Sequence, residues 1–432
     1  MWLAFVLGAQ ALTLEEAWKS AAGDSQEAVM ISESERQSRL MLSQALWSLG
    51  PRVAATGNWT LNQREIALDF GGSFPPEVLA LIENVTGAPV DFGDPTIIQE
   101  KQYLDANISV IQPLLNLRSL PGVVGAKALV RAGEAQSEAS LNQLQVGVAR
   151  VYWGVLLARS AEKIAQDSLA LSRQYVHNAK ALVDAGSAPP QALLQAQLAE
   201  AKAERDLLGA QARRVQSEDL FKALTGLSAT GELVRPGLPG LPWSSADEAL
   251  GRAEKARPEL LAANEQSNVA DAYRSISRLG WAPTIDGRFT QAWTENAGFS
   301  GENSTWMVVV TANWTLWDAG YRVTDNQRTA SQAIQARAAA TKMVEDTEVA
   351  VRAAWSEKER ATQALAAAQK EAALGAENLR LTEASHRLGS ATALDLEEAR
   401  IRRDAALLAV DSEEMGLHLA TYQLLALGGA LR

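Results

Sequence analysis

The chain of 432 residues contains no cysteine and only three histidines, His177, His386 and His418, which are far apart in the sequence. The absence of cysteine excludes a thiol nucleophile, a disulfide, a thiolate metal site, covalent haem attachment and a lipid anchor on cysteine. No other pattern of residues indicates catalysis. We therefore expect the protein not to be an enzyme, with no catalytic residue, cofactor or metal site.

The sequence also lacks a basic excess and a long apolar run. Its formal net charge is −11, with 40 Lys and Arg residues interspersed among 51 Asp and Glu residues, whereas a nucleic-acid-binding chain carries a basic stripe. Nucleic acid is therefore not an expected partner. No stretch approaches the roughly 18 apolar residues that a membrane-spanning helix needs. If the chain enters a membrane, it must do so as strands.

A short apolar stretch, residues 1–11, ends in Ala9-Gln10-Ala11 and fits the small-x-small cleavage site of a secretory signal. No Lys or Arg precedes the apolar residues. Two interpretations therefore stay open: a truncated signal peptide, or a buried N-terminal segment. The cleavage signature favours the signal peptide.

The chain is internally duplicated. A shift of 232 residues pairs Pro51 with Pro283, and later in the chain a shift of 203 residues pairs Gly186 with Gly389. Prolines and glycines that match at structural breaks are hard to explain by chance, even in alanine-rich sequence. The change of shift means that the first half carries 29 extra residues, which fall within 65–102.

Two repeats of one layout, 12–228 and 244–432, are predicted on either side of a Pro/Gly-rich linker at 229–243. Each repeat should contain a helix, two strands and a long helical hairpin. The expected ranges are helices 14–48 and 246–280, strands 52–64, 103–113, 284–294 and 306–317, and hairpins 122–227 and 321–427, with first helices 122–185 and 321–388. At 1.5 Å per residue the long helices reach on the order of 100 Å. Apolar residues at three- and four-residue steps after Leu141 predict a coiled-coil seam.

The strand runs alternate between apolar and polar residues, as in Leu104, Ala106, Ile108 and Val110. Tryptophans within or at the ends of these runs are candidates for the aromatic girdle of a membrane barrel: Trp59, Trp293, Trp306, Trp314 and Trp317. Four strands cannot close a barrel, since small closed barrels need about eight, so several chains would have to share one. The alternative is the half-buried sheet of a soluble α+β protein.

Several motifs resemble those of the TolC-type outer-membrane efflux proteins, and the resemblance covers essentially the whole chain. They are Thr13-Leu-Glu-Glu-Ala17, the strand-to-helix junctions Gln112-Pro-Leu-Leu-Asn116 and Leu316-Trp-Asp-Ala-Gly320, and the turns Ala185-Gly-Ser-Ala-Pro-Pro-Gln191 and Arg387-Leu-Gly-Ser-Ala-Thr-Ala-Leu-Asp395. No single motif is highly specific for the family. The order and spacing of the motifs in both halves, taken together, are specific.

This resemblance implies a mostly α fold with a transmembrane β part. Three identical chains would share a twelve-stranded barrel in the outer membrane, and their coiled-coil hairpins would form an α-helical barrel in the periplasm. The implied function is the outer-membrane channel subunit of a tripartite efflux or type I secretion system, a passive conduit gated at its periplasmic tip. The implied partners are outer-membrane lipid, a periplasmic adaptor protein and an inner-membrane pump or ABC exporter. A soluble periplasmic coiled-coil scaffold with an ordinary sheet is the alternative.

The same resemblance places the two hairpin turns at the periplasmic tips, where they would dock the adaptor. The residues concerned are Gly186, Ser187, Arg387, Leu388, Gly389 and Ser390. Any helical hairpin also needs a glycine to reverse the chain, so these turns have an ordinary structural explanation as well.

The resemblance also implies a pore constriction formed by acidic rings just beyond the second turn, where this chain carries Asp395 and Glu398. Their i, i+3 spacing puts both carboxylates on one helix face, and three copies would form acidic rings that favour cations. Asp395 also completes a Thr-x-x-Asp capping box with Thr392, and both roles are compatible. Some relatives hold the closed state with an arginine and a tyrosine, but Ala391 and His386 stand at those positions here.

Overall fold

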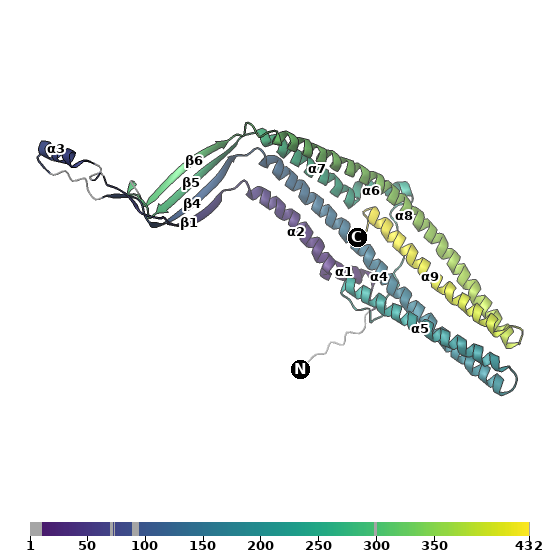
Figure 1. Cartoon of the computed structure of the whole chain (residues 1–432). Coiled ribbons are helices and arrows are strands. Elements are labelled where there is room, and N and C mark those ends of the chain that lie inside the picture. The colour runs from purple at the N-terminus through teal and green to yellow at the C-terminus, as the bar shows by residue number, and fades with distance from the viewer. Residues whose placement is uncertain (1–10, 70–71, 73, 89–94, 298–299, 432) are drawn as a thin grey trace, which may run out of the picture. The chain divides into compact units, whose positions relative to one another are not determined.

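The computed structural model describes residues 11–69, 72, 74–88, 95–297 and 300–431. The signal peptide predicted for residues 1–11 lies almost wholly outside them. The described chain is mostly helical, with one four-stranded and one two-stranded sheet (Figure 1). None of its helices has an apolar stretch long enough to cross a membrane.

Each half of the chain runs through the same order of elements. The first half contains α1 (Leu14–Asp24), α2 (Gln26–Trp47), β1 (Arg52–Leu61), β4 (Gln102–Leu115), α4 (Ser119–Asp184) and α5 (Pro190–Thr225). The second contains α6 (Ala246–Ala256), α7 (Pro258–Arg278), a 3-10 turn η1 (Leu279–Trp281), β5 (Thr284–Thr294), β6 (Ser304–Asn313), α8 (Tyr321–Arg387) and α9 (Ala393–Leu427). Between β1 and β4 the first half inserts β2 (Ile66–Leu68), α3 (Pro76–Thr86) and β3 (Thr96–Gln99).

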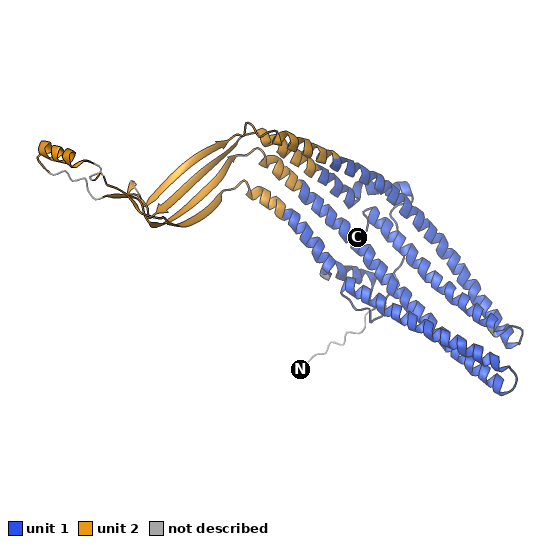
Figure 2. Ribbon diagram, in the orientation of Figure 1, with its two compact units in different colours: residues 1–39, 128–267, 335–432 blue, residues 40–127, 268–334 orange. Residues whose placement is uncertain are grey.

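The chain divides into two compact units that cut across both halves (Figure 2). Unit 1 comprises residues 1–39, 128–267 and 335–432 and contains most of the helices. Unit 2 comprises residues 40–127 and 268–334 and contains all six strands of the described residues. The sequence halves are therefore not two separately packed bodies, because each half contributes to both units.

The two helices expected at 14–48 and 246–280 are each broken, so the prediction of one continuous helix is wrong in both halves. The first breaks at Ser25, whose hydroxyl accepts a hydrogen bond of 3.1 Å from the amide of Ala28 and starts α2. The second breaks at Arg257, because Pro258 comes next and disfavours helical backbone in the preceding residue. The break could have been predicted from the sequence, because Pro258 is visible there.

Buried alanines recur every seven residues along the long helices. In α5 they are Ala196, Ala203 and Ala210, and in α8 they are Ala354, Ala361 and Ala368. A repeat of seven is the period of a left-handed coiled coil, and alanine allows the two helix backbones to approach closely. The small side chain thus explains why the heptad pattern of these helices is hard to see in a plot of large apolar residues.

Unit 1 has its main core where α4 and α5 meet α1, α6 and α9. Its largest fully buried side chains include Trp153, Tyr152 and Phe221. The predicted linker packs into this core, since Leu233 and Trp243 are both buried. The linker is also fastened to the start of the chain, because the amide of Leu12 donates to the carbonyl of Glu232 at 2.8 Å.

His418 on α9 is buried in unit 1 against Trp153, with ring centroids 4.5 Å apart. Burial disfavours the charged imidazolium and lowers the pKa of His418 from 6.5 to about 4. Between these two pKa values the unfolded chain binds a proton at His418 and the folded chain does not. The folded state therefore loses stability as the pH falls through this window.

We predict that replacing His418 by phenylalanine weakens this acid destabilisation. A shift from 6.5 to about 4 corresponds to about 3 kcal/mol at full protonation of the unfolded state. The measurement is the midpoint of guanidinium-induced unfolding in detergent between pH 7 and pH 4. His177→Gln, which replaces an exposed histidine, is the control. An unchanged pH dependence in His418→Phe would contradict the assignment.

Candidate functional site

The four-stranded sheet of unit 2 has strand order β1-β4-β5-β6 and is antiparallel throughout. One cross-strand row consists of Val53, Val110, Phe289 and Val308, which are paired in register. Side chains in such a row lie on the same face of the sheet. Val308 is 60% exposed, so this face presents aliphatic and aromatic side chains to its surroundings.

The opposite face of the same sheet is polar. It carries Asp105, Asn107, Arg288 and Thr294, which fall in the alternate phase of their strands. The hydroxyl of Thr294 donates to the Asp105 carboxylate at 2.5 Å. Alternation of one apolar face with one polar face is the pattern of a strand that separates lipid from an aqueous interior.

Trp59, Trp293 and Trp306 lie in strands, on the apolar face predicted for them. Trp314 and Trp317 lie beyond the end of β6, so the strand predicted at 306–317 is too long. The strand stops at Asn313 because its partner β5 begins at Thr284, directly after Pro283. The indole of Trp314 instead donates to the backbone carbonyl of Trp281 at 3.0 Å.

The outer edges of β1 and β6 pair with no strand of the described chain. Each edge presents a row of backbone N–H and C=O groups that require partners. Four strands do not close a barrel, so a barrel built from this sheet would need further strands.

The two hairpin turns of unit 1 have the same backbone geometry. Gly186 and Gly389 adopt φ values of 70° and 75°. The amides of Ser187 and Ser390, one residue later, each donate to the carbonyl five residues earlier, at 2.8 and 2.9 Å. This is the Schellman motif, in which glycine adopts the left-handed conformation at low cost.

All six predicted tip residues are exposed, and Leu388 is the most exposed large apolar residue of the two turns at 84%. The two turns lead into their next helices differently. Pro189 and Pro190 start α5 without a side-chain cap, whereas Thr392 caps α9. The tips thus share a backbone turn but present different side chains.

Near the tips, a cluster of side chains connects the first hairpin to the second. Tyr175 on α4 lies between His386 at the end of α8 and Arg400 on α9. The ring centroids of Tyr175 and His386 are 5.8 Å apart, and the guanidinium carbon of Arg400 is 6.0 Å from the Tyr175 ring. Burial raises the pKa of the Tyr175 hydroxyl. Sequence reasoning missed this cluster, since its members belong to different hairpins.

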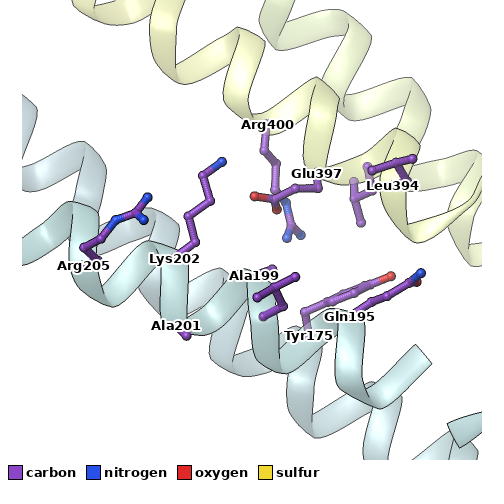
Figure 3. Close-up of a pocket in the computed structure, with 11 residues that line it drawn as sticks. Tyr175, Gln195, Ala199, Ala201, Lys202, Arg205, Leu394, Glu397 and Arg400 are labelled. Atoms are coloured by element: carbon purple, nitrogen blue, oxygen red, sulfur yellow. The ribbon is translucent and has the colours of Figure 1, made fainter. Parts of the chain in front are cut away.

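A cavity of about 600 Å³ opens beside this cluster, between α5 and α9 (Figure 3). Figure 3 shows Lys202 and Arg205 on the α5 side and Glu397 and Arg400 on the α9 side. Tyr175 and several aliphatic side chains complete the lining. The cavity therefore combines an apolar wall with three basic side chains and one acidic side chain.

Asp395 is the capping residue that the sequence predicts. Its carboxylate accepts hydrogen bonds from the amide of Thr392 at 2.8 Å and from its hydroxyl at 2.7 Å. These bonds lower the pKa of Asp395. Glu398, on the same helix, is exposed and pairs with Arg402 at 2.5 Å. Whether either carboxylate faces a pore depends on the assembly, so both assignments stay predictions. Among the described residues, no cluster of His, Asp or Glu has the arrangement of a metal site.

Solved structures of outer-membrane channels share the fold of this chain. The Campylobacter jejuni CmeC outer membrane channel has a TM-score of 0.79 at 12% identity, covering 97% of this chain and 86% of that one. The Vibrio cholerae outer membrane protein VceC has a TM-score of 0.72 at 15% identity, covering 97% of both chains. The open state of the Neisseria gonorrhoeae MtrE outer membrane channel has a TM-score of 0.71 at 18% identity, covering 97% of this chain and 89% of that one.

Residues 249–428 match the family "Outer membrane efflux protein". No curated protein matches the chain by sequence. The family match in the second half and the fold shared over the whole chain support the predicted resemblance to outer-membrane efflux proteins. The mostly helical fold with a few strands is confirmed by the same solved structures. The family consists of channel proteins and not of enzymes.

We predict that Val308→Arg, on the apolar face of β6, prevents assembly into the outer membrane. An arginine on the lipid side of a barrel strand costs about 2 to 4 kcal/mol near the bilayer midplane. The neighbouring Met307 lies in the opposite phase of the same strand, paired with Thr290, so Met307→Arg is the matched control. The measurement is the amount of each variant in outer-membrane fractions. Equal loss, or equal tolerance, of the two variants would contradict the assignment of faces.

Proposed function

We propose that three copies of this chain form a passive efflux conduit across the outer membrane. The observation that carries the proposal is the incomplete sheet, with one exposed apolar face and two unpaired edges among the described residues. Lipid cannot satisfy backbone groups, so a sheet in a bilayer must close on itself. Three sheets of four strands joined at the β1 and β6 edges give a closed barrel of twelve. The helical hairpins then form the periplasmic part, and the conduit performs no catalysis.

The proposed partners are a periplasmic adaptor and an inner-membrane pump, with the adaptor bound at the hairpin tips. Six exposed residues on two turns of equal geometry support this location: Gly186, Ser187, Arg387, Leu388, Gly389 and Ser390. The family description as an efflux protein favours export of small molecules over secretion of polypeptides.

In the same proposal, Asp395 and Glu398 narrow the pore and select cations. The hydrogen bonds from Thr392 support this role for Asp395, because they hold its charge in one place and lower its pKa. The ion pair with Arg402 offsets part of the charge of Glu398. We therefore assign the larger share of selectivity to Asp395.

Planar-bilayer recordings of the purified protein test the conduit. We expect particles with the mass of three chains, discrete channel openings and a preference for cations. The double variant Asp395→Asn with Glu398→Gln should lower that preference several-fold, because it removes both carboxylates from every copy. The asparagine side chain keeps an oxygen that can accept the capping hydrogen bonds, so the helix start is preserved. Reversal potentials in a salt gradient give the measurement.

Glu345→Gln, an exposed acid on α8 remote in sequence from the tip, serves as the charge control. A monomer without channel activity would overturn the conduit and favour the soluble scaffold. Normal channels with unchanged selectivity in the double variant would overturn only the acidic constriction.

Adaptor binding is tested by replacing Leu388 with aspartate. Because the side chain is 84% exposed, the change should leave the folded trimer intact. We expect cross-linking from a photoreactive residue at Ser187 to the adaptor to fall about tenfold, as for a hot-spot contact, with a matching loss of efflux from cells. Leu374→Asp, on the exposed surface of α8, is the control. Undiminished cross-linking in Leu388→Asp would contradict adaptor binding at this tip.

A further inference from the structure

The helix α3 lies within residues 65–102, the stretch that holds the 29 extra residues of the first half, and it presents an apolar stripe that is not buried. Val78, Leu81, Ile82 and Val85 share the i, i+3, i+4, i+7 pattern of one helix face. None of them is buried against the described part of the chain, and Val85 is 79% exposed. The stripe is thus arranged for a contact that one copy does not make.

Both ends of α3 are defined, so the helix is a formed element. Pro76 occupies the first helical turn, and Gly87 ends the helix at φ 71° with its amide donating to the carbonyl of Glu83. An isolated helix of 11 residues is marginal in water. Its stability therefore depends on burial of the apolar stripe.

The stem of α3 continues the strands at one edge of the sheet. After the last β1–β4 pair, the amide of Asn62 donates to the carbonyl of Lys101 at 2.8 Å, and β2 then pairs with β3. β1 is an edge strand, and in the proposed trimer that edge meets the next copy. The stem therefore lies at the boundary between copies, and the symmetry of the proposed trimer places all three α3 helices at the same end of the barrel.

Charge argues against a lipid surface as the partner of the stripe. Between Pro76 and Thr86 the helix carries two acids, Glu77 and Glu83, and no Lys or Arg, whereas helices that lie on membranes are rich in basic residues. At about 100° per residue both acids fall outside the stripe. Stripes that pack together leave these acids directed outward, where water solvates them.

We propose that the α3 helices of the three copies pack against one another through Val78, Leu81, Ile82 and Val85. The contact rests on the proposed trimer, but it is separate from the sheet edges that close the barrel. This contact would make the insertion of β2, α3 and β3 a self-association surface.

Disulfide cross-linking tests this surface, because the native chain has no cysteine. Val85→Cys, within the stripe, is compared with Ala80→Cys, which is exposed on the far side of the helix. Oxidation of the purified full-length trimer should produce covalent dimers at least tenfold faster from Val85→Cys. Adding Leu81→Asp to Val85→Cys should return the rate to that of Ala80→Cys.

Light scattering on the same samples separates the two proposals. An intact trimer with equal cross-linking rates at both positions overturns the α3 contact and leaves the conduit standing. A fluorophore on the introduced thiol of Val85→Cys gives a second measurement. If lipid-borne quenchers reach that fluorophore, the α3 contact is overturned in favour of a membrane contact. A particle with the mass of one chain overturns the conduit itself.

Discussion

The two unpaired edges of the four-stranded sheet are the constraint on which the rest of the structure depends. The backbone groups along β1 and β6 cannot face lipid unsatisfied, and the described chain supplies no further strand for either edge. The apolar face of the sheet makes full exposure of the sheet to water unfavourable as well. In the proposed conduit these two properties are satisfied together when the sheet becomes part of a larger closed one, and that closure requires further copies of the chain.

Much of this fold can be derived from local rules of the sequence. Gly186 and Gly389 reverse the chain because both turns need a positive φ. A glycine between two helical stretches can be recognised from the sequence alone. The alternation of apolar and polar residues places Val110 and Phe289 on one face because strand side chains have a period of two. Both rules act within a few residues, so they require no knowledge of the folded chain.

The features that the sequence did not predict depend on contacts between distant segments. The alternation after Trp306 continues to Leu316, but the strand ends at Asn313 because β5 offers no further partner. The segment at 229–243 has the prolines and glycines of a linker, yet Trp243 is buried in the core. Gly428 makes that burial possible, since a Cβ at this position would collide with the Trp243 ring. The sequence alone does not show that Gly428 and Trp243 lie close together in the folded chain.

The two hairpin tips share one backbone turn but differ in the residues that follow it. Both turns use the same Schellman geometry, but only the second leads into a capping box, formed by Thr392 and Asp395. The first leads into Pro189 and Pro190, which start a helix without adding charge. A carboxylate that caps a helix is held by its hydrogen bonds, and its lowered pKa keeps it ionised as the pH falls. The requirement for a cap therefore supplies a fixed negative charge at the second tip, and a pore lined by three copies of that tip would owe the larger share of its selectivity to this cap.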